Sequence, residues 1–207
     1  MISGIGATRM NLMRLKRRLA LARRGHKLLK DKQEELLRRI IALVAEVRSL
    51  RQVVGDGLSR GLDRLAVARA LMGDDDFEVA LMKPSRKLEL EVNYRSILNV
   101  RVPTYRLKRS GDLFCYGFAH TSAELDIALI QLDRLLDQMV KLAEKQQALK
   151  LLAKETERTR RRVNALEYVL IPGIEETIKF IQLKLTEAER GDLARLMRVK
   201  EIIRGQE

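Results

Sequence analysis

A seven-residue repeat between Leu12 and Val54 constrains the fold more than any other feature of the chain. Two apolar positions per heptad make a stripe that is too narrow to cover a sheet but wide enough to seat one partner helix. The repeat therefore predicts one half of a coiled coil, broken only by His26 and Gln33. Its positions are Leu12, Leu15, Leu19, Ala22, His26, Leu29, Gln33, Leu36, Ile40, Leu43, Val47, Leu50 and Val54.

The composition favours long exposed helices over a compact enzyme. Of 207 residues, 33% are charged and 4% are aromatic, and the sequence has no Gly-rich phosphate loop, Ser-His-Asp order or Cys-His cluster. No apolar run reaches the ~18 residues that span a bilayer, so we expect no direct membrane insertion. The single Cys115, between Phe114 and Tyr116, predicts a buried thiol in a reducing compartment.

Positive charge is concentrated near the N-terminus. Residues 9–51 hold fourteen Lys and Arg against four Asp and Glu. Bases at the start of a helix oppose its dipole at a cost of a few tenths of a kcal/mol each. This placement predicts that an acidic surface or a phosphate backbone meets this end.

The first helix should run from an N-cap at Thr8 to Met72, where Gly73 stops it. We interpret Asp74 to Asp76 as a solvated helix end and not as a metal site, because no flanking ligands follow. Between Val54 and Met72 three glycines interrupt the repeat, and bending or a partner contact is expected there. The glycines are Gly55, Gly57 and Gly61, after which Leu58, Leu62 and Leu65 predict a shifted phase.

From Phe77 to His120 the helical period gives way to alternation. Leu88 to Tyr94 predicts a half-buried strand, and Val100 to Val102 its hairpin partner, ended by Pro103. A third short run, Leu113 to Phe118, follows a turn at Ser110-Gly111-Asp112. About forty residues are too few for a stable separate sheet, so this insert should dock on the helices or on another protein.

A capping box at Thr121 and Glu124 should open the second helix. Its predicted seam reads Leu125, Leu129, Leu132, Leu136, Met139, Ala143 and Gln146, slips to Leu149, and continues Leu152, Thr156, Thr159, Val163, Leu166 and Leu170. Beyond the expected kink at Pro172 it reads Ile174, Ile178, Ile181, Leu185, Leu196, Val199 and Ile203, and Gly205 closes the helix.

Two such helices joined by an insert most simply fold back as an antiparallel pair. That register places Gly25 and His26 near Tyr168, so we interpret Gly25 as making room for a bulky ring or for the Pro172 kink. We interpret His26 as a core histidine that is hydrogen-bonded across the helices, and not as a ligand. Gln33 and Gln146 are interpreted as polar residues that fix the register. The predicted fold is mainly α: a long antiparallel two-helix coiled coil from 1–72 and 121–207, with a small β-hairpin insert at 73–120.

Several segments in order along the whole chain resemble the D subunit of V-type and A-type rotary ATPases. The most specific runs from Thr159 to Pro172, TRRRVNALEYVLIP. The others are Thr8-Arg9-Met10, Leu15 to Leu19, Arg24 to Lys32, Asn99 to Pro103 and Arg195 to Lys200. One departure is Ala7, where many relatives have Pro.

The resemblance implies a non-catalytic rotor shaft without a cofactor, cytoplasmic and peripheral on the membrane. It couples ATP hydrolysis or synthesis in the hexamer of A and B subunits to rotation of the membrane ring. The implied partners are the A, B and F subunits and the central-stalk protein that caps the ring. Three sets of residues are expected to serve these roles.

The predicted contacts with the A/B head are Arg14, Lys16, Arg17, Arg18, Arg158, Arg160, Arg161, Arg162, Glu167, Arg195 and Arg198. The predicted contacts with the F subunit or the ring side are Leu88, Leu90, Val92, Asn99, Val100 and Val102. The predicted helix-helix core includes Leu12, Leu15, Leu19, His26, Leu29, Val163, Leu166 and Leu170.

Two alternatives from other classes stay open on the residues alone. A pI near 10 and Arg-rich helices are the electrostatic footprint of a nucleic-acid-binding protein, although the aromatic residues do not interleave with the bases and no groove-entering motif is present. A homodimeric scaffold coil is the other alternative. Without the resemblance, Arg158 to Arg162 would be either a solvated face or a binding surface.

Overall fold

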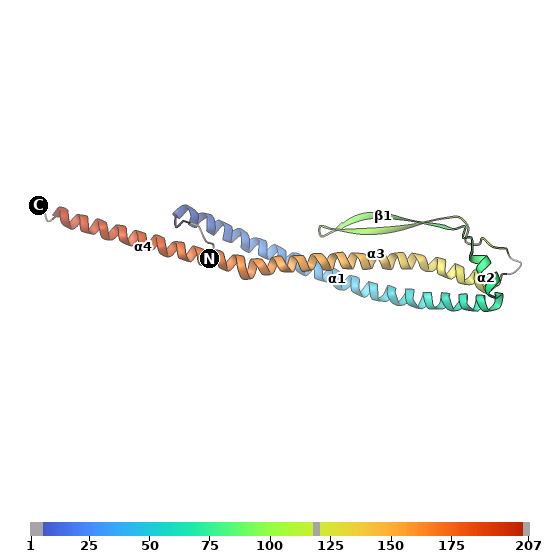
Figure 1. Cartoon of the computed structure of the whole chain (residues 1–207). Helices are drawn as coiled ribbons and strands as arrows, with labels where there is room; N and C mark the ends of the chain where they lie inside the picture. The colour runs from blue at the N-terminus through green and yellow to red at the C-terminus, as the bar shows by residue number, and fades with distance from the viewer. Residues whose placement is uncertain (1–5, 118–120, 205–207) are drawn as a thin grey trace. The chain divides into compact units, whose positions relative to one another are not determined.

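The structure, a computed structural model, describes residues 6–117 and 121–204. The elements are α1 (Arg9–Met72), α2 (Asp74–Leu81), β1 (Lys87–Ile97), β2 (Val100–Ser110), α3 (Ala123–Ala165), the π-helical segment η1 (Leu166–Leu170) and α4 (Ile171–Arg204) (Figure 1). The predicted fold class, mainly α with a long helical pair and a hairpin insert, is confirmed. The chain forms two compact units, the described parts of 1–35 with 157–207, and 36–156.

In the first unit, the start of α1 packs against α4 through an aliphatic cluster. Leu15, Ile174, Ile178 and Ile181 are buried, with Leu12, Leu19, Leu170 and Leu185 packed around them. Thr8 begins α1 as predicted, because its Oγ1 accepts a hydrogen bond from the Asn11 N–H at 3.2 Å. The unit is held by the same stripe that the heptad repeat predicted.

Cross-helix contacts show that the two segments of this unit are antiparallel. Arg9 pairs with Glu189 and Arg23 with Glu175, both at 2.7 Å. His26 lies 3.3 Å from Glu167, next to the predicted Tyr168. The interpretation of His26 as hydrogen-bonded across the helices is confirmed.

Gly25 does not make the close contact that the sequence predicts. A Cβ added there meets nothing within 4 Å, and the Tyr168 side chain is exposed. The expectation that Gly25 makes room for a ring or a kink is therefore wrong, and nothing in the structure explains this glycine.

The expected disturbance at Pro172 takes the form of a π-helical turn. The Ile171 N–H bonds back to the Leu166 carbonyl, five residues earlier. Because Pro172 has no N–H and its ring crowds the preceding turn, a regular α-helical ladder would lose a bond here. Widening the turn between α3 and α4 accommodates the proline within a continuous helical path.

In the second unit, the buried seam of α1 continues through small residues. Val47, Val54, Gly61 and Ala68 are buried at strict seven-residue spacing, whereas Leu62 is 52% exposed. The predicted phase shift to Leu58, Leu62 and Leu65 is therefore wrong, although Leu65 packs at the edge of the Ala68 cluster. Large apolar residues are a poor guide to this stretch, because the helices approach closely there.

The α3 seam also differs from the prediction. Leu125, Leu152, Thr159 and Val163 are buried as expected, but Met139 and Ala143 are exposed. Ala128, Leu135 and Ala148 are buried instead. In this stretch the hairpin contacts α3 as well, so α3 buries more than one face.

The end of α1 and the start of α3, which border the insert, both differ from the prediction. Gly73 ends α1 with φ of 85°, but the helical period does not stop there, because Asp74–Leu81 forms α2. Its first-turn carboxylates favour a helix start, and Asp74 pairs with Arg69 at 2.7 Å. The Thr121–Glu124 capping box is wrong: α3 begins at Ala123, and Thr121 Oγ1 donates to the Gly117 carbonyl at 3.3 Å.

The hairpin is longer than predicted. β1 and β2 pair antiparallel from Lys87↔Ser110 to Ile97↔Val100, around a two-residue turn at Leu98 and Asn99 with positive φ at both. Pro103 lies within β2 and does not end it. Leu88, Leu90 and Val92 are all exposed (46–50%), so, contrary to the prediction, the alternation in β1 does not mark a strand with one buried face.

The third predicted strand does not form over Leu113 to Gly117, and Phe118 lies outside the described residues, as do His120 and Gly205. Cys115 is exposed, so the prediction of a buried thiol is wrong. Its neighbour Tyr116 packs inward and donates to Asp126 at 2.6 Å. None of the described helices combines the length and the apolar character needed to cross a bilayer.

Candidate interaction surfaces

Exposed bases cover the helical pair of the first unit. Arg14, Lys16, Arg17 and Arg18 project from the first turns of α1, and Arg158, Arg160, Arg161 and Arg162 from the last turns of α3. Within the described chain, only Arg161 of these eight has an ion-pair partner. Long solvated cations without an internal partner are available to an acidic surface.

Arg161 is paired along its own helix with Glu157, four residues earlier. The hydrogen bond, followed by the charge attraction, lowers the pKa of Glu157 and raises the pKa of Arg161. Both side chains are largely exposed, so the pair adds little to stability. Because Glu157 partly neutralises it, Arg161 attracts an acidic partner less strongly than Arg160 and Arg162 do.

Glu167 occupies a different environment from the bases with which it was grouped. It lies in η1 and faces His26 of α1 at 3.3 Å. A carboxylate in this position serves the contact between the two helices. Glu167 is thereby set apart from the cationic surface.

Near the end of α4, Arg195 and Arg198 lie in a stretch where all described side chains beyond residue 190 are exposed. Leu196 and Val199 are among them, so the predicted seam does not extend over these two residues. Arg195 is 3.6 Å from Asp192 on the same helix. The stretch therefore offers both charged and apolar side chains to solvent.

The predicted core residues of the first unit lie along the seam. Leu15 and Val163 are buried, and Leu12, Leu19, His26, Leu29, Leu166 and Leu170 are intermediate. No residue of this set is exposed. The bases and the seam therefore occupy different faces of the same helices.

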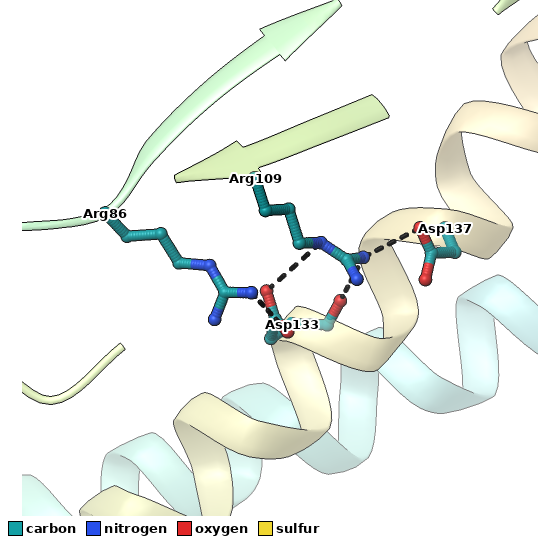
Figure 2. Close-up of polar contacts among 4 residues, drawn as sticks. All are labelled: Arg86, Arg109, Asp133 and Asp137. Carbon is teal, nitrogen blue, oxygen red and sulfur yellow. Dashed lines mark hydrogen bonds and ion pairs between the residues drawn. The ribbon is translucent and has the colours of Figure 1, made fainter. Parts of the chain in front are cut away.

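In the second unit, an ion cluster ties the hairpin to α3. Arg86 Nη2 lies 3.2 Å from Asp133, and Arg109 lies 2.7 Å from Asp137 and 3.7 Å from Asp133 (Figure 2). Arg109 also donates to the Asp133 carbonyl at 3.1 Å. Figure 2 shows both guanidinium groups converging on one face of α3.

Sequence patterning did not reveal this cluster. The sequence feature that could have indicated the cluster is the pair Asp133 and Asp137, two carboxylates four residues apart in a Leu-rich helix. Which bases they would meet could not be read from the chain, because Arg86 precedes β1, Arg109 lies near the end of β2, and only the strand pairing brings them together. Arg86 Nε and Asp133 Oδ1 are buried without a hydrogen bond.

The six predicted residues of the hairpin are not equally accessible. Leu88, Leu90, Val92 and Asn99 are exposed, Val100 is intermediate and Val102 is fully buried. Val102 therefore serves the docking of the hairpin and is unavailable to a partner. Leu88, Leu90 and Val92 are accessible along β1 and Asn99 at its turn, and Leu88 also lines a hollow with Leu132 and Leu136 of α3.

No group of His, Cys, Asp or Glu among residues 6–117 and 121–204 could hold a metal ion. An open groove of ≈ 510 Å³ lies between α1 and α3 of the second unit. Arg60, Arg64, Arg134 and Asp63 are among its lining residues. An open, charged groove on helices is suited to contacts with a macromolecule.

Comparison with known proteins accounts for the helical pair and the insert together. The model of the family described as the ATP synthase D subunit matches residues 11–201. A V-type ATP synthase D subunit from Clostridium novyi (strain NT) is 49% identical over 96% of this chain and 94% of its own length. The proteins of that name from Acetivibrio thermocellus and Thermoanaerobacter sp. (strain X514) are 46% and 47% identical over 98% and 96% of the chain, and over 93% and 96% of their own lengths. The chain belongs to the ATP synthase D-subunit family.

Proposed function

We propose that this chain is the central rotor shaft of a V-type or A-type ATP synthase. It transmits torque between the A and B subunits and the membrane ring, and catalyses no reaction itself. The family match over residues 11–201 carries this proposal. The shaft comprises 1–72 and 121–207, and the insert comprises 73–120.

The helical pair has the mechanical character that the role requires. A buried aliphatic cluster and cross-helix ion pairs resist separation of the two helices in the first unit. The bases around that cluster meet acidic or polar loops of the A and B subunits. Exposed ionic contacts are individually weak and exchange readily with water, so they can break and re-form as the shaft turns.

The exposed hairpin faces the F subunit or the protein that caps the ring. Leu88, Leu90 and Val92 are accessible for this contact. The protein is then cytoplasmic and peripheral on the membrane, attached through its partners.

Single-molecule rotation tests the proposal. The full chain is assembled with the A, B and F subunits, the hexamer is fixed to glass, and a bead is attached through Cys115, which is exposed. We expect ATP-driven, unidirectional rotation of the bead. Failure of the chain to co-purify with the hexamer, or retention of nucleic acid in its place at physiological salt, would contradict the proposal.

A further inference from the structure

The two edges of the hairpin differ, and the difference follows from its turn. In a two-residue hairpin the closing pair, Ile97↔Val100, exchanges hydrogen bonds, and hydrogen-bonded and non-hydrogen-bonded pairs then alternate. Leu88, Leu90, Val92 and Tyr94 fall in non-hydrogen-bonded pairs. Their backbone N–H and C=O groups therefore point away from β2, and we call this row the β1 edge.

Two observations on β2 support this alternation. Pro103, opposite Tyr94, has no N–H to give to β1. The N–H of Tyr105, opposite Val92, donates at 3.0 Å to Glu144 of α3 and not to β1. The outward side of β2 is thus interrupted at its centre by a proline and by a carboxylate.

The β1 edge has no equivalent cover. No hydrogen bond to its four N–H groups is found among the described residues. The side chains along it are largely apolar and 46–70% exposed. A long, exposed, apolar edge strand would pair readily with another chain, and proteins usually protect such edges.

The chemistry of the β1 edge specifies its occupant. A row of unpaired N–H and C=O groups is satisfied by an extended segment, and exposed side chains at every second residue call for apolar residues at the same period. Both Glu residues of the hairpin, Glu89 and Glu91, lie on β1, beside the alternate positions of the incoming segment. Basic or neutral polar residues at those positions would complement these carboxylates, whereas acidic residues would repel them.

We infer that the β1 edge binds an extended segment of a neighbouring subunit, which adds a third strand to the hairpin and alternates apolar residues with basic or neutral polar ones. This deepens the proposed function and rests on it, because it gives the mode by which the hairpin contacts its partner. Since Pro103 and Glu144 interrupt the opposite edge, the longer uninterrupted row for an added strand is on β1.

Hydrogen exchange at single-residue resolution tests the inference, with the full chain alone and in the complex purified with its neighbouring subunits. We expect the amides of Leu90, Val92 and Tyr94 to exchange about tenfold or more slowly in the complex. The amides of Glu89, Glu91 and Asn93 already lie in the ladder and should change much less. Uniform or absent protection of β1 would overturn the inference.

A matched pair of proline variants gives a second readout. Val92→Pro removes an N–H from the β1 edge, and Leu107→Pro removes one from the outward side of β2. We expect Val92→Pro to weaken retention of the partner about tenfold or more, and Leu107→Pro to leave it nearly unchanged. Equal effects would count against the inference.

Two further outcomes separate the inference from its alternatives. Protection of the β1 edge that rises with concentration in the free chain would identify a second copy as the occupant and overturn the assignment to a neighbouring subunit. Absence of any assembly overturns the proposed function and this inference together, whereas assembly without alternating protection overturns only the inference.

Discussion

Leu135 fills the space that Gly57 leaves open on α1: a Cβ added to this glycine would lie 2.7 Å from Leu135 Cδ1. Gly61 stands in the same relation to Leu132, also at 2.7 Å. Glycine in a helix interior costs stability, so close packing of two leucines offsets part of that cost. Two of the three glycines that interrupt the apolar pattern, Gly57 and Gly61, are points of contact between α1 and α3.

A set of Gly→Ala variants tests this packing. Gly55 has nothing within 4 Å of an added Cβ, so Gly55→Ala should stabilise the chain by about 0.5–1 kcal/mol through helix propensity. Gly57→Ala and Gly61→Ala should gain less or lose stability, because Leu135 and Leu132 must turn away. Denaturant unfolding measures all three. Equal stabilisation by all three substitutions would show that the contacts with Leu135 and Leu132 do not affect stability.

The Asp133 cluster should control docking of the hairpin. The Asp133 side chain is 16% exposed and meets two arginines, whereas Asp137 is 51% exposed. Asp133→Asn should weaken docking by about 1–3 kcal/mol, because two partly buried guanidinium groups lose their counter-charge. Asp137→Asn should cost less than about 1 kcal/mol. Amide exchange of Tyr105, whose N–H binds Glu144, reports docking directly. Similar exchange in both variants would contradict this ranking.

Charge reversal of Arg160, Arg161 and Arg162 to Glu should weaken assembly with the A and B subunits. The expected loss is large at low salt and small at high salt, because screening removes the charge term. Binding measured at about 0.05 and 0.5 M salt gives this slope. Reversal of Arg48, Arg51 and Lys150, exposed bases outside the predicted contacts, is the matched control. Unchanged assembly and ATPase activity in the first variant would remove these arginines from the head contact.

Tyr116 should make stability depend on pH in the alkaline range. Desolvation, and then the hydrogen bond to Asp126, raise the pKa of Tyr116. A raised pKa contributes stability that is present below the unfolded value of about 10 and is lost as pH rises above it. Tyr116→Phe should cost about 1 kcal/mol at neutral pH and flatten the decline above pH 10. Thermal unfolding between pH 7 and pH 11 measures both effects, and parallel declines in the two proteins would exclude Tyr116 as the cause.

The sequence is a good guide where local periodicity carries the information. Each of the heptad positions from Leu12 to Val54 is buried or half-buried, and the alternation at Leu88 to Tyr94 marks a real strand. The register that sets His26 beside residue 168 is correct to one position. A repeat of 3.5 residues and a repeat of two each specify a backbone conformation without knowledge of the partner.

The same reasoning fails where one pattern has two structural meanings. Small side chains add little hydrophobic signal, so Gly61 and Ala68 do not register as seam positions, yet both are buried there. Asp74 to Asp76 fit a helix end and a helix start equally well, and α2 begins with them. A proline such as Pro103 ends a strand only where the missing N–H would point into the ladder.

The helices, the hairpin and the resemblance to the D subunit could all be read from the chain, because each is written in residues close together along it. Three relationships emerged only from the folded protein: Asp133 meets Arg86 and Arg109, Glu144 covers the N–H of Tyr105, and the β1 edge is left open. They depend on which face of α3 the hairpin meets. Contacts between residues far apart in sequence are set by packing and charge in space, which local periodicity does not encode.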